Sequence, residues 1–140
     1  MAETLKRRPV YRNIHISQLA HYRLPPAGWV SILHRISGAL LFILLPFVIW
    51  MFDTSVTSEV RYAEFASIFA AGWGAVPGWF FKLVALALIW AYLQHFIGGL
   101  RHVWMDITHA VDQEFGRLSA LVTIAATALL TLALGYKLFY

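Results

Sequence analysis

Two short polar runs interrupt otherwise apolar stretches of the chain, one at residues 31–38 and one at residues 95–102. Their histidines, arginines and hydroxyl residues are Ser31, His34, Arg35, Ser37, His95, Arg101 and His102. An arginine at the centre of a membrane helix costs roughly 2.5–3.5 kcal/mol on insertion scales, and less near an end. A chain that accepts this cost commonly uses the residue, so both runs are candidate functional sites.

Helical spacing places the polar residues of each run on one face. The residues that share a face are Ser31, His34, Arg35 and Gly38 in the first run, and His95, Gly98, Gly99, His102 and Asp106 in the second. His34 lies five residues inside Trp29, and His95 lies six residues before Arg101. On antiparallel helices the two histidines are therefore at similar depth, and we expect the polar faces to meet.

The second run suits haem binding. A neutral imidazole deep in an apolar helix is a ready axial ligand for haem iron. The glycine pair beside His95 leaves room for a flat macrocycle or a neighbouring helix, and His34 and Arg35 offer cations to haem propionates. His95 and His102 are separated by about 10.5 Å along the helix, so they cannot share one iron. Either His34 or a histidine of another chain can oppose His95, and a histidine hydrogen-bonded across helices without a cofactor is the alternative.

The first run suits quinone binding. Ser31 and Arg35 are one helical turn apart near the water boundary, where they can hydrogen-bond a quinone carbonyl. A fixed cation also stabilises the charge that reduction places on the quinone oxygens. The competing interpretations are a serine bonded to its own helix and an arginine that snorkels to lipid headgroups. Similarly, His102, Asp106 and His109 form either a proton-accessible cluster or a solvated helix end.

Three apolar blocks, each with a single formal charge, must position these residues. The chain is 60% hydrophobic and 13% charged, against about 45–50% and about 25% in a soluble domain. Each block exceeds the roughly 20 residues that cross a bilayer, and a backbone in lipid must satisfy its own hydrogen bonds. We predict an all-α membrane protein with a cytoplasmic N-terminal arm at residues 1–28 and a three-helix transmembrane domain at 29–140. The helices are expected at about 29–52, 79–105 and 118–139.

Smaller features refine this layout. Pro46 is expected to kink the first helix. A short amphipathic stretch is expected around residues 60–69, in the loop that follows. The third helix is expected to pack against the other two, because Gly135 and its alanines permit a neighbouring helix to approach closely. The first apolar block is expected to be a retained span rather than a signal peptide, since 28 polar-rich residues precede it.

Charge distribution predicts the topology. Residues 1–28 contain five basic residues and one acidic residue, a net charge of +4, whereas residues 53–78 contain one basic and three acidic residues, a net charge of −2. The positive-inside rule places the N-terminus in the cytoplasm and, after three crossings, the C-terminus outside. The pI of about 9.7 therefore indicates membrane orientation rather than nucleic-acid binding. The arm is suited to docking on another protein, or to attraction by anionic lipid.

Two absences limit the chemistry of this chain. It has no cysteine, which excludes an iron–sulfur cluster and a disulfide framework. It also has no Gly-rich phosphate loop and no dinucleotide fingerprint. Any flavin or nucleotide chemistry is therefore expected on another subunit.

The two polar runs, with Asp106 after the second, resemble the larger, cytochrome b-type membrane-anchor subunit of succinate dehydrogenase (respiratory complex II). The Arg8-Pro9 pair, the size and the three-helix layout agree, so the resemblance covers nearly the whole chain. The arm departs from the family pattern, because residues 11–15 (Tyr-Arg-Asn-Ile-His) replace the commoner Ser-Pro-His run.

The resemblance implies specific roles. His95 is implied to be one axial ligand of a haem b iron, with the second ligand supplied by a smaller anchor subunit. His34 and Arg35 are implied to lie near the propionates, and Ser31 and Arg35 to line a ubiquinone pocket shared with that anchor and an iron–sulfur subunit. Succinate oxidation would occur on a flavoprotein subunit, so this chain would carry no catalytic succinate site.

Three alternatives remain at this stage. One is the anchor of a fumarate reductase working in reverse, because sequence does not assign direction. Another is a haem-free structural anchor in which His95 only packs. A stand-alone di-haem carrier would need inward histidines at two depths, and the far halves of the helices have none. The short arm favours a bacterial inner membrane over the mitochondrial inner membrane.

Overall fold

The computed structural model describes residues 15–19 and 21–140. Most of the basic arm lies outside the described residues, and so does the expectation that the arm docks on a partner protein. The regular elements are α1 (Ile16–Leu19), α2 (Pro26–Ile43), α3 (Leu45–Val56), α4 (Glu59–Ala70), α5 (Gly78–Thr108) and α6 (Gln113–Phe139). Three of them, α2, α5 and α6, are long and apolar enough to cross a membrane. The predicted fold class, an all-α membrane protein with three spans, is confirmed.

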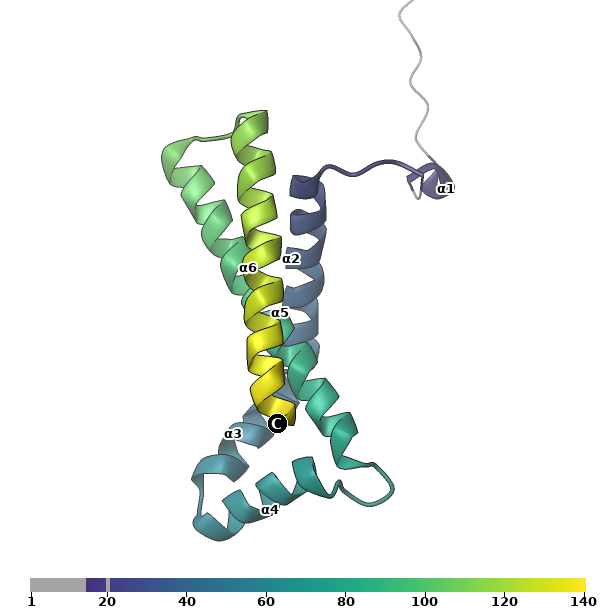
Figure 1. Cartoon of the computed structure of the whole chain (residues 1–140), viewed down its shortest axis with the longest axis vertical. Helices are drawn as coiled ribbons and strands as arrows, with labels where there is room; N and C mark the ends of the chain where they lie inside the picture. The colour runs from purple at the N-terminus through teal and green to yellow at the C-terminus, as the bar shows by residue number, and fades with distance from the viewer. Residues whose placement is uncertain (1–14, 20) are drawn as a thin grey trace, which may run out of the picture.

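The three long helices form one bundle in which α5 packs against both α2 and α6, and α2 also contacts α6 (Figure 1). We call the end where α2 and α6 begin and α5 ends the Pro26 end. Helices α3 and α4 lie at the opposite end (Figure 1). Small residues such as Ala91 and Ala120 fill the buried contacts, whereas large apolar residues such as Phe42 and Leu132 are exposed. This distribution suits a bundle surrounded by hydrocarbon, where exposed apolar surface carries no penalty.

The long helices extend beyond their apolar blocks. α2 begins at Pro26, whose fixed φ and missing N–H suit the first turn. α5 continues to Thr108 and is followed by His109 in a left-handed conformation, with φ of 54°. α6 begins at Gln113, because the Asp112 side chain caps it by accepting a hydrogen bond from the Phe115 N–H at 2.8 Å. Hydropathy marks only the part of each helix that is apolar, so each long helix begins one to five residues before its apolar block.

The first span is divided rather than only kinked. The expected helix over 29–52 is two helices, α2 and α3, separated at Leu44 (φ −87°, ψ 1°). Pro46 lies in the first turn of α3, where it has no N–H to donate to the preceding turn. α3 turns away from the bundle axis (Figure 1), and α4 then covers the predicted amphipathic stretch. The 18 residues of α2 are about 27 Å long, which is close to the hydrocarbon thickness.

Candidate functional site

The polar faces of α2 and α5 meet in the half of the bundle nearer the Pro26 end, as their spacing predicts. The rings of His34 and His95 stack with centroids 4.2 Å apart and an interplanar angle of 12°. The ring of His102 stands edge-on to His34 at 5.2 Å and 71°. Three imidazoles from two helices are thus gathered in one cluster.

A hydrogen bond across the helices fixes the proton on the His95 ring. The Nδ1 atom of His95 lies 3.1 Å from the backbone oxygen of His34. A carbonyl oxygen can only accept, so His95 Nδ1 must carry the proton. The same oxygen accepts a second bond, at 2.9 Å, from the hydroxyl of the fully buried Ser37. In the neutral ring the other nitrogen, Nε2, therefore keeps its lone pair.

Glycines make this close approach possible. A Cβ atom added at Gly38 would lie 2.8 Å from Cε1 of His95, and one added at Gly98 would lie 3.1 Å from Cδ2 of His34. A Cβ at Gly99 would lie 3.5 Å from Nε2 of His34, which is ordinary contact. The sequence left open whether the glycine pair admits a macrocycle or a neighbouring helix. In the structure it admits α2.

The stacked rings bear on a second open question, the axial partner of His95. Two axial imidazoles on one iron point their nitrogens at each other through the metal, which parallel rings at 4.2 Å cannot do. His34 is therefore not placed as the axial partner of His95, and no macrocycle fits between the two rings. His95 Nε2 has no hydrogen-bond partner among residues 15–19 and 21–140, and the side chain is half-buried. A haem would have to reach this nitrogen from outside the α2–α5 contact.

This donor set fits a haem better than a directly held metal ion. In the described part of the chain, no group of three or more His, Cys, Asp or Glu side chains is placed to bind a metal. A haem iron needs fewer protein ligands than a directly bound metal ion, because the macrocycle supplies four ligands and the protein supplies only the axial ones. A neutral imidazole whose Nδ1–H is held by a carbonyl has the orientation of a metal-ligating histidine.

The quinone candidates lie on the same helix but outside the histidine contact. Ser31 is half-buried and Arg35 is exposed. Neither side chain has a hydrogen-bond partner among the described residues. Asp106 and His109 are also exposed, and no hydrogen bond joins either to His102 in the described structure. The structure thus gathers the histidines, whereas Ser31 and Arg35 remain available to a ligand or another subunit.

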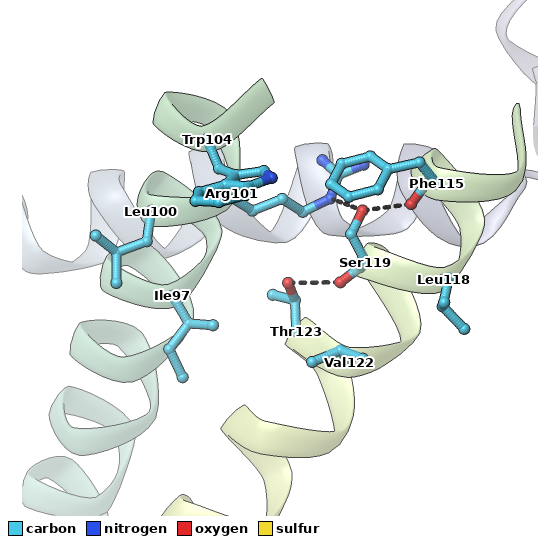
Figure 2. Close-up of a pocket in the computed structure, with 9 residues that line it drawn as sticks. All are labelled: Ile97, Leu100, Arg101, Trp104, Phe115, Leu118, Ser119, Val122 and Thr123. Atoms are coloured by element: carbon cyan, nitrogen blue, oxygen red, sulfur yellow. Dashed lines mark hydrogen bonds between the residues drawn. The ribbon is translucent and has the colours of Figure 1, made fainter. Parts of the chain in front are cut away.

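Sequence reasoning missed a polar contact on another face of α5. Arg101 is only 8% exposed, and its Nε donates to Ser119 Oγ at 2.9 Å (Figure 2). Its Nη2 donates to the Gly116 carbonyl at 3.2 Å. Gln94 is 1% exposed, and its side-chain nitrogen has no partner in the described structure. Gln94 was missed because it is uncharged and lies inside an apolar block, which had been analysed by its formal charges. A hydroxyl repeat could have revealed the polar stripe on α6, and its members are Ser119, Thr123, Thr127 and Thr131.

These observations define a class: a three-span helical membrane protein with a histidine cluster between its first two spans. Residues 4–134 match the model of the succinate dehydrogenase/fumarate reductase transmembrane subunit family. The chain belongs to this family, and its resemblance to the cytochrome b-type membrane-anchor subunit of succinate dehydrogenase is confirmed.

Three curated relatives carry the name succinate dehydrogenase cytochrome b556 subunit. The protein from Paracoccus denitrificans is 30% identical over 109 residues, which cover 78% of each chain. The protein from Coxiella burnetii is 29% identical over 102 residues, 73% of this chain and 77% of the relative. The protein from Rickettsia felis is 25% identical over 116 residues, 83% of this chain and 85% of the relative. The matches thus extend over most of each relative.

Proposed function

We propose that this chain anchors a succinate:ubiquinone oxidoreductase in the membrane, supplies one axial ligand of its haem b and forms part of its ubiquinone-reduction site. The observation that carries the proposal is the hydrogen bond from His95 Nδ1 to the His34 carbonyl. This bond orients the neutral ring and leaves the lone pair of Nε2 free to bind iron. The cytochrome b names of the relatives support a b-type haem.

His95 is the proposed iron ligand, and the second axial ligand comes from a small membrane-anchor subunit. The stacking of His34 on His95 supports this division, because it removes His34 from the axial position. His34 and Arg35 are proposed to hold the propionates through hydrogen bonds and charge. When bound, haem b supplies a one-electron redox centre inside the bilayer.

Ser31 and Arg35 are proposed to hold the ubiquinone headgroup. A hydroxyl and a guanidinium one turn apart offer donors to a quinone carbonyl, and neither donor is used within the described chain. The fixed charge of Arg35 favours the anionic character that develops on the quinone oxygen during reduction. The pocket is completed by the iron–sulfur subunit and the small anchor.

Succinate chemistry is assigned to other subunits. A flavoprotein subunit oxidises succinate and an iron–sulfur subunit carries the electrons, while this chain supplies no succinate site. The basic N-terminal region supports a cytoplasmic N-terminus and a periplasmic C-terminus in a bacterial inner membrane. The family description covers both succinate dehydrogenase and fumarate reductase, and the names of the relatives favour the succinate-oxidising direction.

Replacement of His95 tests the ligand role. We expect His95→Leu in the assembled complex to abolish or strongly shift the reduced b-type absorption bands of isolated membranes. His102→Leu is the matched control, since it removes a neighbouring imidazole from the same helix, and we expect it to retain the bands. An unchanged spectrum in His95→Leu would remove the ligand claim and favour a haem-free structural anchor.

Replacement of Ser31 and Arg35 tests the quinone role. We expect Ser31→Ala to raise the KM for ubiquinone about tenfold, since a hydrogen bond to a ligand carries roughly 1.5 kcal/mol. Arg35→Gln is expected to lower kcat as well, because its charge acts on the developing anion. The control is Ser55→Ala, a serine of α3 at the other end of the bundle that bonds only the Phe52 carbonyl. Wild-type kinetics in both test variants would contradict the proposal.

A further inference from the structure

A groove runs between α5 and α6 at the Pro26 end of the bundle (Figure 2). Its volume is about 440 Å³. The lining residues are Ile97, Leu100, Arg101, Trp104, Phe115, Leu118, Ser119, Val122 and Thr123. The α5 members of this lining lie on a different side of the helix from His95, Gly98 and His102, because 100° of turn separates successive residues. The groove is therefore distinct from the proposed haem and quinone sites.

One buried cation lies in this groove without a counter-ion. The side chain of Arg101 reaches across to Ser119 of α6 (Figure 2). Its two acceptors, Ser119 Oγ and the Gly116 carbonyl, are both neutral. Among the described residues no carboxylate pairs with it. The residue is only 8% exposed. A buried charge is costly unless an opposite charge accompanies it, so the site favours a ligand that brings a negative charge.

The remaining walls have the polarity of a lipid site. Arg101 lies seven residues before the end of α5, about 10 Å along the helix, which places it toward the headgroup region. Trp104 lies one turn nearer that end, and tryptophan is enriched at the membrane interface. Below the guanidinium, in the direction of the bilayer centre, the walls are mainly hydrocarbon, from Ile97 on α5 and Val122 on α6 (Figure 2). The hydroxyl of Thr123, on the same side, is bonded to the Ser119 carbonyl.

We propose that this groove binds one anionic phospholipid, with its phosphate at Arg101 and an acyl chain along Ile97, Leu118 and Val122. A neutral quinone tail or an apolar helix would fill the walls but leave the guanidinium without a counter-charge. A zwitterionic lipid carries no net charge to offset it. An anionic lipid satisfies both parts of the groove, and a bound lipid would also hold the Pro26 ends of α5 and α6 together.

The test is lipid retention by the purified complex. The complex is exchanged into detergent with equimolar phosphatidylglycerol and phosphatidylcholine, and bound lipid is identified by native mass spectrometry. The variants are Arg101→Gln, which removes the charge, Arg101→Lys, which keeps it, and Leu118→Trp, which fills the groove. Leu129→Trp is the matched control, because it adds the same bulk to α6 at an exposed position outside the groove.

We expect wild type, Arg101→Lys and Leu129→Trp to retain one phosphatidylglycerol per copy of this chain. Arg101→Gln should weaken the preference for the anionic lipid about fivefold, the factor that follows from roughly 1 kcal/mol per cation at a membrane surface. Leu118→Trp should lose the lipid while keeping Arg101. Equal retention of both lipids by wild type, undiminished phosphatidylglycerol in Arg101→Gln, or a quinone or a partner's protein segment in the groove would each overturn the proposal.

Discussion

Two faces of α5 accommodate buried polar side chains in different ways. The face toward α2 presses imidazoles against glycine and backbone, and its polar atoms bond a main-chain carbonyl. The face toward α6 uses long polar side chains: Arg101 reaches Ser119, and Gln94 is enclosed without a partner for its nitrogen. The first contact is made by rings packed directly on glycine and backbone, whereas the second is bridged by a long side chain beside a groove.

The difference indicates what each contact can tolerate. A ring held by a backbone carbonyl cannot shift without losing its orientation, and the axial role proposed for His95 depends on that orientation. Side chains such as Arg101, or Leu86 of α5 beside Gly135 of α6, can adjust by rotating. We therefore expect equally small changes to have large effects on the α2–α5 contact and small effects on the α5–α6 contact.

The largest expected effect is that of Gly38→Ala. The added methyl would lie 2.8 Å from Cε1 of His95, so the ring must move away from α2 and its bond to the His34 carbonyl must weaken. Overpacking of this kind costs roughly 1–3 kcal/mol. We expect haem occupancy of the complex to fall, with haem affinity lowered about 10–100-fold, the range for disturbed partners of metal ligands. The measurement is haem titration followed by absorption.

Gly99→Ala is the control for this prediction. It adds the same methyl group to the same interface, but at 3.5 Å from His34, an ordinary contact distance. Near-wild-type haem affinity is expected there. Equal affinities in Gly38→Ala and Gly99→Ala would show that the close contact at Gly38 does not orient His95.

Periodicity in the sequence was sufficient to predict the α2–α5 contact. Residues with a helical repeat share a face, and two such faces at equal depth on antiparallel helices can meet, so spacing made the pairing of His34 with His95 an expectation. The stacked geometry did not follow. Whether two rings oppose each other through a metal or lie parallel depends on the helix separation, which the glycines set and which no spacing rule contains.

The α5–α6 contact was harder to predict from sequence because its partners lie inside apolar blocks. Ser119 and Gln94 carry no formal charge, so hydropathy and charge counts do not distinguish them from the apolar residues around them. The break between α2 and α3 was foreseen as a kink at Pro46, but its size depends on how α3 and α4 pack at that end of the bundle. The proline marks the position of the break, and tertiary contacts set its extent.

The second prediction concerns Gln94. A buried donor without an acceptor costs roughly 1–3 kcal/mol, and methionine has a similar shape and helix propensity without that donor. We expect Gln94→Met to raise the free energy of unfolding of the complex in mixed micelles by about 1 kcal/mol. Destabilisation would mean that the amide finds an acceptor. A double-mutant cycle with Thr127→Val, whose hydroxyl also lacks a partner among the described residues, would test whether Thr127 is that acceptor.

The third prediction is a smaller loss at Ser119. Ser119→Ala removes the acceptor of Arg101 Nε, and hydrogen bonds between membrane helices contribute about 0.6 kcal/mol on average. We expect unfolding in mixed micelles to become easier by about that amount. Ser67→Ala is the matched control, because the Ser67 hydroxyl bonds only to a carbonyl of its own helix. A loss of 2 kcal/mol or more at Ser119 would show that this contact is as rigid as the one at His95.

The smallest effect is expected at Gly135, where the contrast between the two faces is sharpest. A Cβ there would lie 2.9 Å from Cδ1 of Leu86, almost as close as the methyl of Gly38→Ala lies to His95. The obstructing atom, however, is the end of a flexible leucine that can change rotamer, whereas His95 is tied to a carbonyl. Alanine also gains about 1 kcal/mol of helix propensity over glycine. We therefore expect Gly135→Ala to leave both haem affinity and the free energy of unfolding within about 0.5 kcal/mol of wild type. A loss comparable to that of Gly38→Ala would contradict the distinction, because distance alone, and not the freedom of the neighbouring side chain, would then set the cost.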